Sequence, residues 1–322
     1  MIRQAVFLVG GRGTRLGALT DALPKPLMPV GGRPFLELLL DNAARFGFEQ
    51  ILLLCGYRSE QVAERLDRRS MRGAEIRCLV ESSPQGTAGA LREAAAALDD
   101  QFLLGNGDSL FDINLLALEA WSPPQPWTAK LALRRVEDAG RYGAVETVPS
   151  ADGQGARVSA FAARGPARPG VINGGIYVLR KQALDAIGPG PCSLEGQVFP
   201  QLAAAGRLWG REIDGFFLDI GLPEALAQAQ TLIPAQLRRP AAFLPWPQLA
   251  GDAARARAAN DQGWWAFGYR PRPATEPEET GPLLRRINAG LRPAGGHLDG
   301  FYWAEDAAAA LAQARQEWSI SS

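Results

Sequence analysis

Short apolar runs alternate with helical patterns through the first two thirds of this 322-residue chain. Six runs have strand length and are nearly continuous in apolar residues, which is typical of strands buried on both faces: residues 5–10, 50–56, 75–81, 101–108, 129–136 and 171–179. Apolar residues at three- and four-residue spacing predict helices over residues 34–47, 59–69 and 86–100. We therefore predict a Rossmann-like α/β fold, with a mixed, mostly parallel sheet flanked by helices. Ligands of such sheets bind outside the carboxyl ends of the strands, so polar residues there are candidates for function.

The composition is that of a folded protein and excludes several kinds of function. Apolar residues make up 47% and charged residues 21%, and 34 Lys and Arg balance 34 Asp and Glu. No basic block is visible, so we expect no nucleic-acid partner. Cys55, Cys78 and Cys192 are scattered and His297 is the single histidine, which argues against a structural zinc. The first apolar run is too short for a signal peptide or a membrane span, so we expect a cytoplasmic protein.

The amino-acid composition changes near Arg238, after which Pro, Ala and Arg become frequent. A chain of this length exceeds the usual size of a single domain. We therefore predict two domains, a larger one over residues 1–236 and a small one over residues 237–322.

A glycine-rich segment follows the first strand and reads LVGGRGTRL. Such a turn brings backbone N–H groups close to phosphates. A dinucleotide-binding turn also needs an acidic residue at the end of the second strand, where Cys55 and Gly56 stand. A P-loop needs Gly-Lys-Ser/Thr, whereas Gly13 is followed by Thr14 and Arg15. The sequence therefore weakens both the interpretation as a dinucleotide-binding turn and the interpretation as a P-loop.

The loop carries cations of its own, Arg12 and Arg15 in the turn and Lys25 between Pro24 and Pro26. The prolines restrict the chain around the lysine, so its ammonium is aimed at little entropic cost. Three positive charges beside amide donors suit a triphosphate whose charge shifts during a reaction. A plain glycine turn with solvated arginines is the alternative.

Two later segments also place polar residues next to predicted elements. In LLGNGDSLFDI, Asp108 ends an apolar strand, and a carboxylate there suits Mg²⁺, which prefers hard oxygen ligands. Taken alone, an Asp in this place is more often a turn former or a helix cap. In ESSPQGTAGAL, Pro84 and Gly86 form a turn and Thr87 precedes a helix, which a plain loop with a capped helix also explains.

Together these segments resemble the sugar-1-phosphate nucleotidyltransferases. That family opens with L-A-G-G-x-G-T-R-L and then P-K-P-L, and this chain departs from the pattern at Val9. The segments ESSPQGTAGAL, NGDSLFDI, RYGAV, INGGIYVL and FFLDIGLPE follow in the family's order up to about residue 230. The resemblance implies the fold of the nucleotide-diphospho-sugar transferases. It also implies a reaction in which a sugar 1-phosphate oxygen attacks the α-phosphorus of a nucleoside triphosphate and pyrophosphate leaves.

The resemblance assigns roles to individual residues. It implies catalysis by Arg15 and Lys25, and Mg²⁺ ligation by Asp108 and Asp219. The implied nucleotide-binding residues are Gly10, Gly11, Gly13, Thr14, Glu81, Gly86 and Thr87, with Glu81 facing a purine's amino donors. The implied sugar-phosphate-binding residues are Tyr142, Gly143, Arg164, Asn173 and Gly174. Where the family carries a Glu-Lys pair, this chain has Ala163 and Arg164, so the carboxylate that grips a sugar hydroxyl is missing.

The branch that this chain resembles most is the D-glycero-D-manno-heptose 1-phosphate guanylyltransferases. We therefore expect an enzyme whose partners are GTP and a heptose 1-phosphate and whose cofactor is Mg²⁺. The alternatives are mannose 1-phosphate or another sugar with a different nucleotide, and a non-catalytic sensor of nucleotide sugars, which Ala163 motivates. Retention of Arg15, Lys25, Asp108 and Asp219 argues against the sensor, because a sensor needs no metal pair.

Some chains of that branch carry a haloacid-dehalogenase-type heptose bisphosphate phosphatase at the C-terminus, and residues 237–322 are similar to a degenerate form of it. Pro245 and Pro247 stand where its two aspartates would be, so this part lacks the nucleophile and we expect it to be non-catalytic. An aromatic cluster here fits either a core or a contact in a homo-oligomer: Trp264, Trp265, Phe267 and Tyr269. We expect His297 to be structural.

Overall fold

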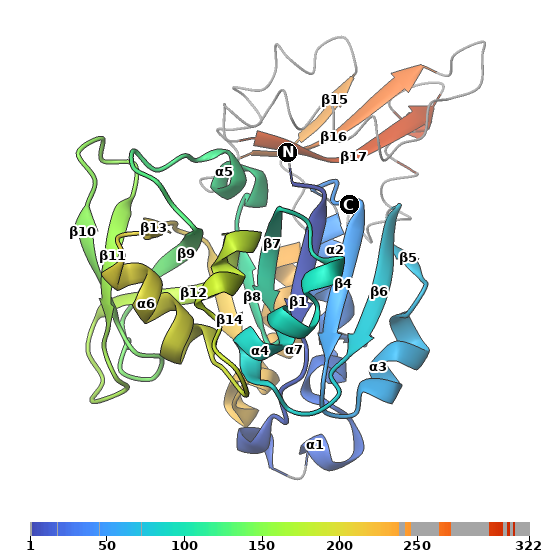
Figure 1. Ribbon diagram of the computed structural model, residues 1–322. Coiled ribbons are helices and arrows are strands. Elements are labelled where there is room, and N and C mark those ends of the chain that lie inside the picture. The colour runs from blue at the N-terminus through green and yellow to red at the C-terminus, as the bar shows by residue number, and fades with distance from the viewer. Residues whose placement is uncertain are drawn as a thin grey trace.

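The computed structural model describes residues 2–237 apart from positions 18, 45 and 72, and further on residues 242–245, 264–271, 296–304, 308–309 and 312. Ten of the described strands form one mixed sheet (Figure 1). In spatial order they are β10 (Val145–Pro149), β11 (Ala156–Phe161), β13 (Leu208–Glu212), β9 (Ala129–Val136), β12 (Gly170–Arg180), β7 (Gln101–Asn106), β1 (Gln4–Leu8), β4 (Gln50–Cys55), β6 (Ala74–Val80) and β5 (Ser70–Met71). The predicted mixed sheet flanked by helices is confirmed.

The six apolar runs singled out in the sequence are β1, β4, β6, β7, β9 and β12. β1 lies at the centre and pairs in parallel with β4 and with β7, and β4 pairs in parallel with β6. β12 is antiparallel to both β7 and β9, which joins the parallel half of the sheet to a more irregular half. Because β1, β4 and β7 run the same way, their carboxyl ends meet at one edge of the sheet.

Helices cover both faces of the sheet because side chains of a strand alternate between its faces. In β1, Ala5 and Phe7 are buried in a cluster with α2 (Phe35–Ala44) and α7 (Pro223–Leu237). Val6 is buried in a second cluster with α4 (Gly86–Glu93) and α6 (Phe199–Ala204). Figure 1 shows α4 on one side of the central strands and α2 on the other. The other described helices are α1 (Leu19–Ala22), α3 (Ser59–Leu66) and α5 (Leu115–Ala120).

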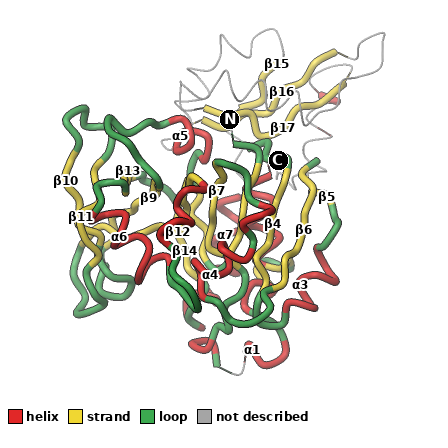
Figure 2. Tube along the Cα trace, viewed as in Figure 1, coloured by secondary structure: helices red, strands yellow, loops and turns green. Residues whose placement is uncertain are grey.

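Shorter elements complete the part of the chain around the strand ends. β8 (Ser109–Asp112) pairs with β14 (Phe216–Asp219), and β2 (Pro29–Val30) pairs with β3 (Arg33–Pro34). Single turns of 3₁₀-helix cover Thr14–Leu16 and Lys25–Leu27, and a π-helical turn covers Leu194–Val198. In Figure 2, α1 lies at the lower edge of the molecule, beyond the carboxyl ends of β1 and β4.

Beyond α7, three parallel strands are described: β15 (Ala242–Pro245), β16 (Trp264–Pro271) and β17 (Gly296–Ala304). Pro245 ends β15, whereas Pro247 lies outside the described residues. The aromatic cluster falls in β16 and His297 in β17. The division at residue 236, the relationship to a phosphatase and the role of the aromatic cluster stay predictions.

Candidate active site

A cavity of about 480 Å³ opens at the carboxyl ends of the central strands. Leu8 and Val9 line it from the end of β1, and Asn106 and Gly107 line it from the end of β7. The residues singled out in the sequence that lie on its wall are Gly10, Gly11, Gly13, Thr14, Arg15, Lys25, Glu81, Gly86, Thr87 and Asp108. Segments far apart in the sequence, around residues 8–15, 81–87 and 106–108, therefore form one site, at the edge of the sheet where ligands are expected.

Two glycines of the glycine loop, Gly10 and Gly13, stand where a side chain would not fit. Gly13 has a φ of 66°, and a Cβ there would lie 3.0 Å from Cβ of Lys25. A Cβ on Gly10 would lie 3.1 Å from Oε1 of Glu81. The loop is thus pressed against both Lys25 and Glu81, which leaves its backbone open to the cavity. Arg12 is placed differently, since its guanidinium lies 5.9 Å from the ring centre of Tyr57.

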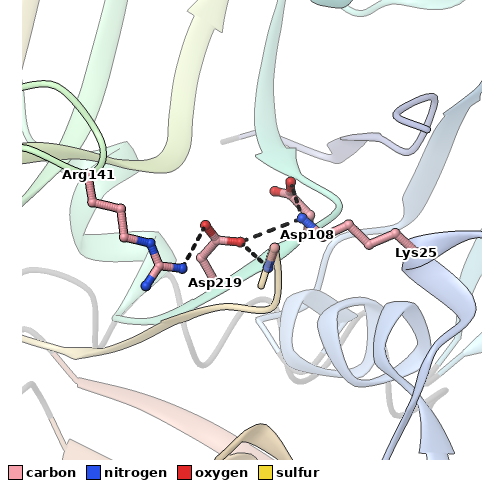
Figure 3. A network of polar contacts seen from close by, with 5 residues as sticks. Lys25, Asp108, Arg141 and Asp219 are labelled. Atoms are coloured by element: carbon pink, nitrogen blue, oxygen red, sulfur yellow. Dashed lines mark hydrogen bonds and ion pairs between the residues drawn. The ribbon is translucent and has the colours of Figure 1, made fainter. Parts of the chain in front are cut away.

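Lys25 links two carboxylates from distant strands (Figure 3). Its Nζ lies 2.8 Å from Oδ2 of Asp108 and 3.6 Å from Oδ1 of Asp219. Asp219 also accepts a hydrogen bond of 2.7 Å from the backbone N of Gly221, and its Oδ2 lies 3.8 Å from Nη2 of Arg141. The side chain of Lys25 is only 6% exposed. A cation so buried needs such partners, because an unpaired buried charge is strongly destabilising.

Arg15 approaches the same place from the loop. A Cβ on Gly221 would lie 3.1 Å from Nη2 of Arg15 and 3.1 Å from Nζ of Lys25. Gly221 therefore keeps open the space into which both cations point. Two cations and two carboxylates, Asp108 and Asp219, meet beside a loop of backbone amides, which is a site that can bind and polarise phosphate groups.

The oxygen donors at this point fit a divalent cation. Asp108 and Asp219 both turn a carboxylate oxygen toward Lys25, so the site already holds positive charge between them. Carboxylates are the hard ligands that Mg²⁺ takes, usually one or two together with substrate phosphates. No group of three His, Cys, Asp or Glu side chains that could hold a metal occurs among the described residues. Two carboxylates would supply only part of a coordination shell, and substrate phosphates and water would supply the rest.

A second wall of the cavity is built by the loop before α4. Gly86 has a φ of 72°, and a Cβ there would lie 2.6 Å from the carbonyl oxygen of Cys192. The hydroxyl of Thr87 accepts a hydrogen bond of 2.8 Å from the backbone N of Leu194, so this side chain holds the neighbouring segment in place. Glu81 is partly buried, and this burial raises its pKa, while a hydrogen bond from the Gln85 backbone lowers it.

The residues assigned to the sugar phosphate do not lie on the wall themselves. Tyr142 packs edge-on against Phe217, with ring centres 5.8 Å apart. Gly143 and Gly174 are required by packing, since a Cβ would lie 2.7 Å from the carbonyl oxygen of Ala162 and 2.4 Å from the Phe111 ring, respectively. Arg164 acts through its charge: burial raises the pKa of Glu195, and the guanidinium of Arg164 opposes this rise. Asn173 lies beside the wall, where its side chain donates hydrogen bonds to two residues that line the cavity, Tyr177 and Glu195.

Sequence reasoning missed several residues of this site. Tyr177, Ser193 and Glu195 line the cavity, and Arg141 contacts Asp219. Glu195 follows no apolar strand run and stands in a π-helical turn, so no periodic pattern marks it. Arg141 opens the segment RYGAV, of which only Tyr142 and Gly143 were assigned a role from the sequence.

A glycine loop, cations and carboxylates gathered at the strand ends of an α/β sheet define a nucleotide-binding protein of the doubly wound type. The fold is shared with HddC from Yersinia pseudotuberculosis, which is 26% identical, with a TM-score of 0.62 over 71% of this chain and 98% of that one. HddC has also been solved complexed with GMP-PN. The chain belongs to the nucleotidyl transferase family, whose model matches residues 4–236.

Curated relatives agree with this assignment. A mannose-1-phosphate guanyltransferase of Yarrowia lipolytica is 32% identical over 249 residues, which are 75% of this chain and 68% of that protein. A D-glycero-alpha-D-manno-heptose 1-phosphate guanylyltransferase of Aneurinibacillus thermoaerophilus is 31% identical over 229 residues, 70% of this chain and 96% of that protein. The resemblance stated from the sequence motifs is thereby confirmed. The roles of the individual site residues stay predictions.

Within the described part of the chain, no helix is long and apolar enough to cross a membrane.

Proposed function

We propose that this protein transfers a guanylyl group from GTP to a sugar 1-phosphate, with D-glycero-D-manno-heptose 1-phosphate as the favoured acceptor and mannose 1-phosphate as the alternative. One observation carries the proposal: Lys25 joins Asp108 and Asp219 beside the glycine loop, within a cavity that Arg15 also lines. The relatives named above are guanylyltransferases for mannose and heptose 1-phosphates, which supports this choice of nucleotide and sugar.

The reaction is a direct displacement at phosphorus. An oxygen of the sugar phosphate bonds to the α-phosphorus of GTP, and the bond from that phosphorus to the oxygen bridging to the β-phosphate breaks. Pyrophosphate leaves with the electron pair of that bond. The attacking phosphate oxygen is already ionised at neutral pH, so the step needs no general base.

The residues of the site act by alignment and by neutralising charge. The backbone amides of the glycine loop would bind the triphosphate, and Arg15 and Lys25 would balance the negative charge that moves toward pyrophosphate. Asp108 and Asp219 would hold Mg²⁺, which when bound supplies further positive charge next to the phosphates. Glu81, beside the glycine loop, would accept hydrogen bonds from the amino donors of guanine.

The test is pyrophosphate release from the purified full chain with Mg²⁺. Each nucleoside triphosphate is combined with a panel of sugar 1-phosphates that includes the manno-heptose and mannose compounds. We expect release with GTP and one of these two sugars, and loss of release in Asp108→Asn with the fold kept by circular dichroism. No release with any pair, although a nucleotide sugar binds, would overturn the enzyme and favour a sensor.

A further inference from the structure

A β-bulge in β12 brings together two side chains that a regular strand would keep apart. Nδ2 of Asn173 donates a hydrogen bond of 2.9 Å to the hydroxyl of Tyr177. In a regular strand, residues four apart are separated by about 13 Å. The register between β12 and β9 shifts between these two residues, and Gly175 in the bulge has a φ of 75°. The backbone N of Gly175 also donates to Oδ1 of Asn173 at 3.0 Å, which fixes the orientation of the amide.

Glu195 enters this pair from the π-helical turn Leu194–Val198. Its Oε1 accepts a hydrogen bond of 2.8 Å from Nδ2 of Asn173 and one of 3.4 Å from the hydroxyl of Tyr177. Both donors thus bind the same carboxylate oxygen. Within the described residues, no hydrogen bond to Oε2 of Glu195 occurs. One oxygen of the carboxylate is anchored and the other is free to accept from a ligand.

The surroundings of Glu195 hold its carboxylate at the wall of the cavity. Tyr177 is 1% exposed and shares the cavity wall with Glu195. Two other carboxylates line the cavity, but Asp108 is paired with Lys25 and Glu81 lies beside Gly10. Among the described residues, Glu195 differs from both in being held by two neutral side-chain donors, Asn173 and Tyr177, whereas Glu81 accepts from the backbone N of Gln85.

The chemistry of the position selects the kind of group that it binds. An anionic oxygen repels phosphate, but it is a strong acceptor for hydroxyl donors, and hydrogen bonds to a charged acceptor are stronger than neutral ones. Burial raises the pKa of the Glu195 carboxyl, and the charge of Arg164 acts in the opposite direction. The guanidinium of Arg164 suits a phosphate. A hydroxyl-binding carboxylate beside a phosphate-binding cation matches the two ends of a sugar 1-phosphate.

We propose that Glu195 determines sugar specificity by accepting hydrogen bonds from ring hydroxyls of the sugar 1-phosphate, while Asn173 and Tyr177 position its carboxylate. This inference rests on the proposed function, because it concerns the acceptor sugar of that reaction. It also provides a carboxylate for the sugar, although Ala163 stands at the sequence position expected to carry one.

The test compares hydroxylated and deoxy sugar 1-phosphates in Glu195→Gln, Glu195→Ala and the wild type, with pyrophosphate release as the readout. In the wild type we expect at least one monodeoxy analogue to lose about 10-fold or more in kcat/KM, because the carboxylate then lacks its donor. In Glu195→Ala the preference for the complete sugar should fall to about 1 to 3-fold, with KM for the sugar raised and KM for GTP unchanged. Glu64→Gln, an exposed glutamate of α3, is the matched control.

The outcomes of this experiment distinguish a role of Glu195 in sugar specificity from a structural role. Transfer by the wild type with an unchanged deoxy preference in Glu195→Ala overturns this inference and leaves the proposed function intact. An equal rise in KM for GTP and for the sugar would show a merely structural role and also overturns it. Should both variants fail to fold, the wild type alone decides, because equal use of every deoxy analogue excludes a specific hydroxyl contact. Absence of transfer by the folded wild type overturns the proposed function and this inference together.

Discussion

The ammonium of Lys25 lies 2.8 Å from Oδ2 of Asp108, although 83 residues separate the two in the sequence. The contact joins the loop after β1 to the end of β7, so it ties the phosphate-binding loop to the metal-binding carboxylate of the proposed site. Lys25 is almost fully buried, whereas the side chain of Asp108 is 42% exposed. The pair therefore offers a pre-arranged cation on the protein side and an open carboxylate on the cavity side.

Lys25→Met should abolish most of the activity and also destabilise the fold. The variant leaves Asp108 and Asp219 without the cation between them, and it removes positive charge from the departing pyrophosphate. We expect kcat to fall by about 100-fold or more and the free energy of unfolding to fall by about 1–3 kcal/mol. Stopped assays of pyrophosphate release and thermal unfolding measure the two effects. Lys181→Met, which loses one contact to the carbonyl of Leu98, is the control and should keep its kcat.

Asp219→Asn should weaken the dependence on Mg²⁺ without unfolding the protein. The amide keeps one oxygen that accepts from Gly221 but loses the charge that faces Lys25. We expect the Mg²⁺ concentration for half-maximal rate to rise by about 10-fold or more, and chelation to stop turnover in the wild type. Asp185→Asn, at an exposed position, serves as the control. An unchanged Mg²⁺ titration would remove Asp219 from the metal site.

Glu81→Gln should reduce the preference for GTP over ITP, which lacks the 2-amino group of guanine. Burial raises the pKa of Glu81, so in the wild type this preference should decline as the pH falls through that raised pKa. The glutamine variant should show a preference lower by about 10-fold and independent of pH. Because the folded pKa lies above the unfolded one, the ionised carboxylate destabilises the protein at higher pH. Glu81→Gln should therefore raise the melting temperature at pH 8 but not at pH 4, and the opposite order would contradict this account.

Tyr177→Phe should raise KM for the sugar 1-phosphate while leaving KM for GTP unchanged. The hydroxyl accepts from Asn173 and donates to Glu195, and its loss leaves the carboxylate held by the amide alone. We expect a rise of about 3 to 10-fold and a loss of about 1 kcal/mol in the free energy of unfolding. Tyr57→Phe, whose hydroxyl accepts from Arg58, is the matched control and should leave the sugar KM as it is. Parallel changes in both KM values would count against a role limited to the sugar.

Gly86→Ala should destabilise the protein more than Gly153→Ala. Both glycines have a positive φ, 72° and 66°, so each substitution carries a backbone strain of about 1–2 kcal/mol. A Cβ on Gly86 would also lie 2.6 Å from the Cys192 carbonyl oxygen, whereas nothing lies within 4 Å at Gly153. We expect the extra loss at Gly86 to reach about 1 kcal/mol or more in chemical denaturation. Equal losses in the free energy of unfolding would show that the structure relieves the contact with Cys192 without losing stability.

Local patterns in the sequence predicted much of the sheet and one side of the site. The buried strands are apolar on both faces, so β1, β4 and β7 are visible as continuous apolar runs. The glycine loop and Lys25 follow β1 closely, and Asp108 follows β7, so proximity to a strand end made them candidates and the family resemblance assigned their roles. These residues depend on short-range rules of chain geometry, which a sequence carries directly.

The group of Asn173, Tyr177 and Glu195 depends on long-range contacts, and the sequence indicated only Asn173 among the three. Asn173 and Tyr177 meet only because β12 bulges against β9, and strand bulges depend on pairing with another strand. Glu195 reaches them from a turn that Thr87 holds through Leu194, 107 residues away in the sequence. The sequence alone determined the main strands, the glycine loop that follows the first of them, and the family. Only the tertiary structure brought Glu195 to Asn173 and Tyr177 at the cavity wall, because that arrangement depends on contacts between segments that no local pattern connects.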